Sequence, residues 1–411
     1  MKKTILSAYL IIVCLFCMET KCIATNMYTW SVTQETSDKA MTVSATIANE
    51  TETGNSLNLQ SGAAILIEQT TGQVLYEHNV HEQLRPASVT KIMSILLIME
   101  QIELGKIDYT TRISCSSNAA RMGGSQIWLD TSETLSVDEM LKAICVVSAN
   151  DCVMAMAEHI AGTEEAFVKM MNEKAKELGM NDTTFKNCHG LDEDGHVTSA
   201  YDIALMSREL LNKYPEITKY TTIYMDSLRD GKSSLVNTNK LVRTYNGCTG
   251  LKTGSTSQAL FNLSASATRD GLSLVAVIMK GPTSAIRFDE AKALLDYGFN
   301  NFEYRKLGTK SEVVREVNIE KGISKSVEVV FEKDAGALIL KGQSSSISQT
   351  ISLSDNILAP IAKGETLGKI TYNLGENKLL EVNLIAKEEV KKIDMITMAC
   401  NIYEKWFNLL R

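Results

Sequence analysis

Residues 85–102 read RPASVTKIMSILLIMEQI, in which Ser88 stands three residues before Lys91 at the start of a long apolar run. Residues 92–102 are apolar on nearly every side, so we expect them to form a buried helix. Positions three apart share one helix face, which puts the Lys91 amine within reach of the Ser88 hydroxyl. Burial favours a neutral lysine, and the helix N-terminus adds positive potential at Ser88. The stretch indicates a nucleophile beside its base. An ordinary helix N-cap at Ser88 with a solvated Lys91 in the first turn would give the same sequence pattern.

Two further short motifs carry polar groups that such a serine would need. Ser148-Ala149-Asn150 lies between two expected helices, and by itself it could be a helix cap at a turn. Lys252-Thr253-Gly254, followed by Ser255, lies in an expected strand. A glycine inside a strand marks the close approach of another chain segment or a ligand. A lysine at that point could bind a carboxylate.

The order of strand and helix patterns indicates the architecture around these motifs. Residues 63–79 predict an antiparallel hairpin about a Thr-Gly turn, and residues 261–280 predict another about Arg-Asp-Gly. Helical patterns dominate residues 88–211 between them, and a further helix is expected at 291–299. Strands from both ends of this region should complete one antiparallel sheet with helices packed on it, an α+β fold.

We expect this domain to cover residues 59–300. The composition and the spacing of apolar residues change on both sides of it. Residues 1–24 show the charge, apolar run and small residues of a secretory signal peptide, and residues 25–58 read as a linker. Six short alternating runs in 301–386 predict a small all-β sandwich. The apolar residues of 387–411 fall on one face of a helix with too many charges to span a bilayer. That helix either finishes the β-domain or lies on a membrane surface.

Composition excludes several classes of function. The net charge is −7 and no block of basic residues occurs, which argues against nucleic acid as a partner. The five histidines lack metal-ligand spacing and no G-x-S-x-G elbow is present, so we expect neither zinc nor a Ser-His-Asp triad, and no cofactor. Six cysteines remain after the signal peptide, and they could form a bridge or two or stay as free thiols: Cys115, Cys145, Cys152, Cys188, Cys248 and Cys400.

Together the three motifs form the S-x-x-K, S-x-N and K-T-G set of penicillin-binding proteins and β-lactamases. Residues 61–299 resemble the low-molecular-mass D-alanyl-D-alanine carboxypeptidases in particular, and the β-domain and terminal helix match that family's layout. The resemblance rests on RPASVTKIM, ARMGGSQIWL, SANDCVMAMAEHIAG, FKNCHGLDEDGHVTSAYDIALM, GLKTGST and IRFDEAKALLDYGF. In one departure, Asn150 follows an alanine where β-lactamases have an aspartate. The implied fold is a serine transpeptidase/β-lactamase-like domain.

The resemblance also implies catalytic roles. Ser88 would attack the carbonyl of the penultimate D-alanine, with Lys91 as general base. The backbone N–H groups of Ser88 and Ser255 would hold the oxyanion. Ser148 would relay the proton to the leaving amine, and Asn150 would hold the substrate's amide backbone.

The same resemblance assigns the other end of the substrate. Lys252, Thr253 and Arg287 would receive the terminal carboxylate, beside Gly254 and Ser255. The substrate would be a peptidoglycan stem pentapeptide ending in D-Ala-D-Ala, and β-lactam antibiotics would acylate Ser88 by mimicking it. We therefore expect an exported, membrane-associated, penicillin-binding carboxypeptidase of cell wall metabolism. A β-lactamase and a catalytically weak wall-bound scaffold are the alternatives.

Overall fold

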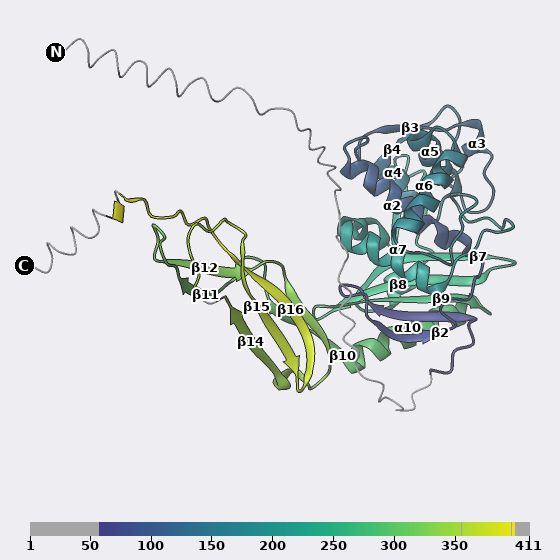
Figure 1. The fold of residues 1–411 in the computed structure, drawn as a ribbon. Coiled ribbons are helices and arrows are strands. Elements are labelled where there is room, and N and C mark those ends of the chain that lie inside the picture. Colours follow the sequence, from purple (N-terminus) through teal and green to yellow (C-terminus); the bar gives the residue numbers. More distant parts are fainter. Residues whose placement is uncertain (1–56, 355, 396, 399–411) are drawn as a thin grey trace, which may run out of the picture. The chain divides into compact units, whose positions relative to one another are not determined.

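The computed structural model describes residues 57–354, 356–395 and 397–398. The predicted signal peptide, nearly all of the predicted linker, and most of the predicted terminal helix lie outside these residues. Figure 1 shows the described elements, which form an α+β domain followed by a β-domain.

One antiparallel sheet of five strands organises the first domain, in the order β2-β1-β9-β8-β7. Both predicted hairpins are present, β1 with β2 and β8 with β9, and the N-terminal strand β1 pairs with β9. The sheet is thus completed from both ends of the domain, as the sequence pattern predicts. Its strands are β1 (Ala63–Glu68), β2 (Val74–His78), β7 (Cys248–Thr256), β8 (Leu260–Arg269) and β9 (Leu272–Gly281).

Helices cover both faces of this sheet (Figure 1). Alternate residues of a strand point to opposite faces, so Ile65 joins the core beneath the large helical layer while Leu66 joins the core beneath α10. The helices of the large layer are α2 (Lys91–Glu103), α4 (Val137–Val146), α5 (Asn150–Ala161), α6 (Glu164–Glu177) and α7 (Ala200–Lys213), and α10 (Ser284–Asn301) covers the other face. Both faces of the sheet are therefore buried, and the site can open only at its edges.

Several short elements connect these layers. Two small antiparallel strand pairs, β3 with β4 and β5 with β6, have no counterpart in the sequence-based prediction. The bounds of these four strands and of the short helices are η1 (Ala87–Thr90), β3 (Arg112–Ser114), α3 (Ser117–Ala120), β4 (Thr134–Ser136), η2 (Pro215–Ile217), α8 (Thr218–Thr221), β5 (Met225–Leu228), β6 (Ser233–Val236) and α9 (Leu241–Thr244).

The β-domain contains all six predicted runs as strands and one more, β10, which lacks a clear alternation of polar and apolar residues. Strands β10 and β13 form one sheet, and the other has the order β11-β12-β16-β15-β14. The bounds are β10 (Phe302–Gly308), β11 (Val313–Asn318), β12 (Ser326–Phe331), β13 (Ala335–Leu340), η3 (Ser344–Ser346), β14 (Ile347–Leu353), β15 (Thr366–Leu374) and β16 (Asn377–Ala386).

The predicted start of the terminal helix at residue 387 is wrong. Val390 exchanges two backbone hydrogen bonds of 2.9 Å with Ile361, and the Ile393 N–H donates to Lys321 O at 2.8 Å. These bonds extend the β-domain to about residue 393, and the first described helical residue is Met395. Among the described residues, no helix has the length and apolar character that crossing a membrane requires.

Candidate active site

Ser88 lies in η1, where the chain turns into the buried helix α2. The residue before it, Ala87, has a φ of 49°, in the left-handed region that disfavours an L-residue with a side chain. The Asn262 side chain on β8 holds the preceding turn by donating to Arg85 O at 2.8 Å and to Pro86 O at 3.0 Å. Ser88 itself is half-buried, so its hydroxyl is fixed at the protein surface. Strain that the surroundings enforce in this way is typical of functional sites.

Lys91 is fully buried directly beside this serine. Its Nζ lies 2.9 Å from Ser88 Oγ and donates to His189 O at 2.6 Å. Burial, followed by the nearby charge of Lys252, holds the pKa of Lys91 well below its usual range. A neutral amine at this distance can take the proton of the serine hydroxyl. The structure thus brings the predicted nucleophile and base together.

Ser148 lies in the turn between α4 and α5, where the motif predicts it, and Asn150 is the first residue of α5. The Ser148 backbone has a φ of 65°, and its buried Oγ makes no protein hydrogen bond among the described residues. The Asn150 side chain donates to Gly123 O at 2.7 Å, while its buried Oδ1 likewise lacks a protein partner within the described part of the chain. Buried polar atoms normally have partners. These two atoms are therefore left without the hydrogen bonds that buried polar atoms normally form.

Strand β7 carries the third motif past Ser88. A Cβ built on Gly254 would lie 2.8 Å from Val89 N and 2.9 Å from Ser88 N, so only glycine permits this approach. Ser255, the next residue, is exposed. The sequence-based interpretation of the strand glycine as a point of close approach is confirmed.

The lysine and threonine of this motif are buried. Lys252 Nζ donates to Thr253 O at 2.9 Å, and Thr253 Oγ1 donates to Thr238 Oγ1 at 2.7 Å. Burial lowers the pKa of Lys252 to about 7, and the Arg287 charge acts in the same direction, whereas the Cys145 thiol opposes it. Lys252 can therefore change its charge near neutral pH.

Arg287 lies on α10, and its Nη1 donates at 3.1 Å to both Gly254 O and Asn262 O. Burial lowers the pKa of this guanidinium to about 10. The structure uses this nitrogen to hold the backbones of β7 and β8. Direct contact with a substrate carboxylate stays a prediction.

Sequence reasoning missed the contributions of the segment 187–193. His189 supplies the backbone carbonyl that binds Lys91, and a carbonyl leaves no trace in a sequence pattern. Gly190 (φ 91°) allows the same segment to approach Ala87, since a Cβ there would lie 2.0 Å from Ala87 O. Asp192 Oδ1 accepts from Thr256 Oγ1 on β7 at 2.8 Å. The segment therefore ties η1 and β7 together.

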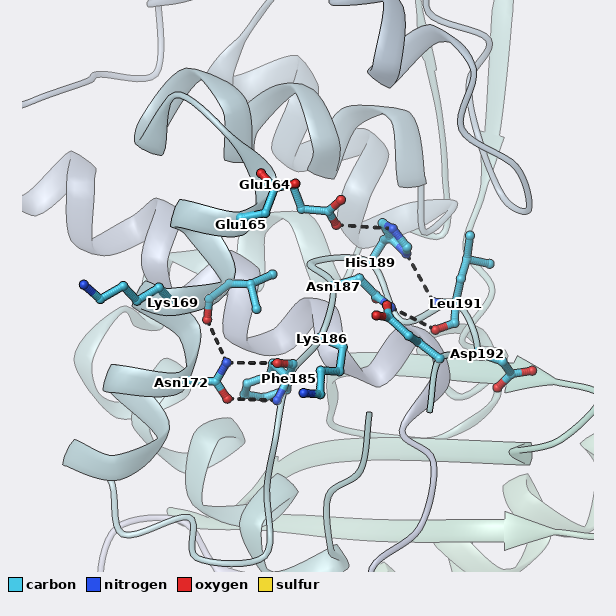
Figure 2. A pocket seen from close by; sticks show the side chains of 12 residues that line it. Glu164, Glu165, Lys169, Asn172, Phe185, Lys186, Asn187, His189, Leu191 and Asp192 are labelled. Atoms are coloured by element: carbon cyan, nitrogen blue, oxygen red, sulfur yellow. Dashed lines mark hydrogen bonds and ion pairs between the residues drawn. The ribbon is translucent and has the colours of Figure 1, made fainter. Parts of the chain in front are cut away.

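Residues of this segment, His189 and Asp192 among them, line a cavity of about 600 Å³ (Figure 2). In Figure 2 the His189 ring points toward Glu164, with 3.4 Å between Nε2 and Oε1. Burial, with the Lys91 charge second, lowers the pKa of His189 to about 3, so the ring is neutral. His189 thus faces the cavity with its ring while its carbonyl oxygen serves the base.

Both ring nitrogens of the buried His196 are hydrogen-bonded within the protein. The Lys186 N–H donates to His196 Nδ1 at 2.9 Å, so the other ring nitrogen, Nε2, carries the proton and donates to Thr90 Oγ1 at 2.8 Å. No group of three or more metal-binding side chains occurs within the described residues. The five described cysteines are free thiols, and Cys400 lies outside the described residues.

Comparisons with known proteins agree with this geometry. A family model described as D-alanyl-D-alanine carboxypeptidase matches residues 47–283, and one described as the C-terminal domain of penicillin-binding protein 5 matches residues 302–392. The D-alanyl-D-alanine carboxypeptidase DacF of Bacillus subtilis is 44% identical over 351 residues, which cover 84% of this chain and 90% of that protein.

Solved structures extend the similarity to the fold. Penicillin-binding protein 5 from Haemophilus influenzae superposes with a TM-score of 0.71 at 31% identity, covering 81% of this chain and 98% of that one. The ampicillin-bound form of penicillin-binding protein D2 from Listeria monocytogenes has a TM-score of 0.55 at 30% identity, covering 59% of this chain and 99% of that one. The chain described here belongs to the serine-type D-alanyl-D-alanine carboxypeptidase family of low-molecular-mass penicillin-binding proteins.

Proposed function

We propose that this carboxypeptidase releases the terminal D-alanine from peptidoglycan stem pentapeptides through an acyl-enzyme on Ser88. The observation that carries the proposal is the 2.9 Å approach of the buried Lys91 amine to the Ser88 hydroxyl. Burial holds the pKa of that amine well below its usual range, and no carboxylate among the described residues forms an ion pair with it, which favours the neutral state that a general base requires.

In the first step Ser88 Oγ attacks the carbonyl carbon of the penultimate D-alanine while Lys91 takes its proton. The negative charge that develops on the carbonyl oxygen is stabilised by the N–H groups of Ser88 and Ser255. Support comes from the Gly254 approach, which brings the end of β7 against the backbone of η1. Two fixed donors at this point need no reorganisation during the reaction.

Collapse of this intermediate breaks the peptide bond, and the departing amine needs a proton. Ser148 relays that proton from Lys91, and Asn150 holds the amide backbone of the substrate. The unpartnered, buried Ser148 Oγ and Asn150 Oδ1 support these roles, because a bound substrate would supply the missing hydrogen bonds. Lys252 and Thr253, with Arg287 behind them, receive the terminal carboxylate. Water then attacks the ester carbon, and the acyl group leaves Ser88.

Labelling with fluorescent penicillin tests the nucleophile. Ser88→Ala should lose the label and stop releasing D-alanine. Ser94→Ala is the matched control, since Ser94 lies on the same buried helix and its Oγ donates to Cys188 O. This variant should keep both activities. Persistent labelling of Ser88→Ala would remove Ser88 as nucleophile, and rapid penicillin turnover without D-alanine release would indicate a β-lactamase.

We also propose that the protein is exported and that residues 395–411 lie in the interface of a membrane. The N-terminal pattern supports export, and the spacing of apolar residues with Trp406 and Phe407 on one face supports an interfacial helix. Since the β-domain extends to about residue 393, a deletion of 395–411 leaves its hydrogen bonds intact. That deletion should release the protein from membranes in a fractionation assay, and unchanged membrane association would contradict the anchor.

A further inference from the structure

Thr238 is a polar residue of the site that none of the three sequence motifs includes. Its Oγ1 accepts a hydrogen bond of 2.7 Å from Thr253 Oγ1, so it lies directly against the threonine of the K-T-G motif. Thr253 is buried, whereas Thr238 is half-buried and keeps access to solvent. A group that binds at the Thr253 hydroxyl therefore lies within reach of the Thr238 hydroxyl as well.

The loop that carries Thr238 connects β6 to α9 and is held by two buried asparagines. Asn237 donates through Nδ2 to Ile223 O at 2.7 Å. Asn239 donates through Nδ2 to Gly250 O on β7 at 2.9 Å. The residues on both sides of Thr238 are thus fixed to the surrounding backbone, and only Thr238 in this trio has solvent access.

The backbone of Thr238 is also attached to the helical side of the site. Its N–H donates at 3.1 Å to the carbonyl oxygen of Val146, the last residue of α4, two residues before Ser148. Thr238 therefore connects the end of α4 with β7, which carries Thr253. A hydroxyl that is fixed in this way loses little freedom when a ligand binds, so a hydrogen bond from it contributes nearly its full strength to affinity.

The hydroxyl proton of Thr238 is available, whereas groups of the K-T-G motif already donate within the protein. Thr253 Oγ1 donates to Thr238 Oγ1, and Lys252 Nζ donates to Thr253 O. A hydroxyl can accept one hydrogen bond while it donates another. Within the described residues the Thr238 hydroxyl accepts from Thr253 and donates to no group. Its proton is therefore free to bind an anion at this point.

We propose that Thr238 binds the terminal carboxylate of the substrate through a hydrogen bond from its hydroxyl. This inference rests on the proposed function, which places that carboxylate at Lys252 and Thr253. The bond that Thr238 accepts from Thr253 polarises its hydroxyl, because hydrogen bonds in a chain reinforce one another. The negative charge of a carboxylate makes the bond stronger than one between neutral groups.

The test compares two thioesters of acetyl-D-alanine. In the thioglycolate the leaving group ends in a free carboxylate, and in the ethyl thioester a methyl group takes its place. Thr238→Val removes the hydroxyl and keeps the branched shape. It should lower kcat/KM on the thioglycolate about 30-fold, largely through KM, because a hydrogen bond to a charged group is worth about this factor. On the ethyl thioester the variant should stay within about twofold of the wild type.

Two control variants accompany this comparison. Thr238→Ser keeps a hydroxyl at the same position and should retain the wild-type preference for the thioglycolate. Thr244→Val makes the same chemical change nearby in the chain, where Thr244 Oγ1 donates to Lys240 O at 3.0 Å on α9. It should match the wild type on both thioesters.

A double variant separates a direct contact from an effect that passes through Thr253. In the Thr253→Val background, Thr238→Val should still lower kcat/KM on the thioglycolate about tenfold, because its bond to the carboxylate does not need the Thr253 hydroxyl. A loss that disappears in this background would overturn the direct contact and make Thr238 a positioning residue for Thr253.

An unchanged preference for the thioglycolate in Thr238→Val would overturn the proposal. Equal losses on both thioesters would overturn it as well, in favour of a structural role. So would a wild-type protein that does not distinguish the two thioesters. A wild-type protein that prefers the thioglycolate but releases no D-alanine from a pentapeptide ending in D-Ala-D-Ala would instead overturn the proposed function and leave the Thr238 contact standing.

Discussion

The lysines of the acylation region differ from those of the β-domain in burial and in ion pairing. The acylation region consists of residues 85–91 and 252–256, and the β-domain of residues 302–393. Lys91 and Lys252 are buried, and among the described residues neither has a carboxylate partner. In the β-domain the paired lysines lie at the surface, as Lys369 and Lys378 do beside Glu381. Burial without a partner lowers the pKa of a lysine amine, to about 7 for Lys252, so that the amine can exchange a proton near neutral pH. Burial of a lysine without a carboxylate thus distinguishes the reactive region from the structural one.

The largest effect should follow from separating β7 and η1. In Gly254→Ala the new Cβ would lie within 3.0 Å of the backbone atoms Val89 N, Ser88 N and Pro86 O, which cannot move aside as a flexible side chain can. A displacement of about 1 Å at reacting groups costs about 10²-fold in rate, so penicillin acylation should fall by this factor.

A glycine of the β-domain provides the contrast. Gly364 has a φ of 85° and open space around it, so Gly364→Ala should cost about 1 kcal/mol of stability through backbone strain. Its acylation rate should equal that of the wild type. Similar acylation rates in the two alanine variants would break the comparison between the regions.

Acid should destabilise the two domains unequally. His189 and His196 are buried and neutral, with pKa values of about 3 and about 4, lowered chiefly by burial. Because each folded pKa lies below the unfolded value of about 6.5, the unfolded state binds more protons as the pH falls, and stability is lost from about pH 6.5 downward. All five histidines of the chain precede residue 200.

We expect the first domain to lose on the order of 3 kcal/mol between pH 7.5 and pH 4.5. Hydrogen exchange resolved by segment measures this loss in the full chain. Protection of β14, β15 and β16 should change little over the same range. An equal loss of protection in both domains would show that these histidines do not govern the response.

The interaction between the two buried lysines predicts a smaller, directional effect. The charge of Lys252 is the second cause of the low pKa of Lys91, after burial. Removing that charge in Lys252→Gln should raise the pKa of Lys91, so a higher pH is needed to leave its amine neutral. The acid limb of the pH profile for penicillin acylation should therefore move to higher pH. An acid limb that stays at the wild-type pH, or moves to lower pH, would contradict the electrostatic interaction between Lys252 and Lys91.

The smallest effect should come from the surface of the β-domain. Glu381 accepts from Lys378 at 2.8 Å and lies 3.3 Å from Lys369, and these bonds lower its pKa. All three groups are solvated, and exposed pairs contribute little to stability. Glu381→Gln should leave both Tm and acylation unchanged. A clear fall in Tm would mean that this ion pair contributes more than its exposure allows.

The sequence was sufficient where a pattern repeats or a motif has fixed spacing. Both hairpins of the first sheet, the buried helix after Ser88 and the positions of the three motifs follow from periodicity and turn residues. The Ser88–Lys91 approach follows from helical geometry, and the low pKa of Lys91 from its burial.

Contacts that involve the backbone were beyond sequence reasoning. The carbonyl of His189 that binds Lys91 and the backbone contacts that fix Thr238 depend on loop conformation, which has no periodic signal. The helix boundary at 387 was wrong for a related reason, since the bonds between Val390 and Ile361 join distant segments. The roles assigned to the site residues stay predictions until the variants are measured.

The pairing of β1 with β9 has a consequence for the order of assembly. Ala63 lies opposite Met279, so the N-terminal strand has to wait for nearly the whole domain before it finds its neighbour. Closing so long a loop is slow, and contacts distant in sequence delay folding. The chain therefore stays open while most of the domain is being synthesised. A ribosome-bound fragment that ends before residue 272 should lack a stable sheet and bind no penicillin, and the reactive serine should appear only when the last strands are complete.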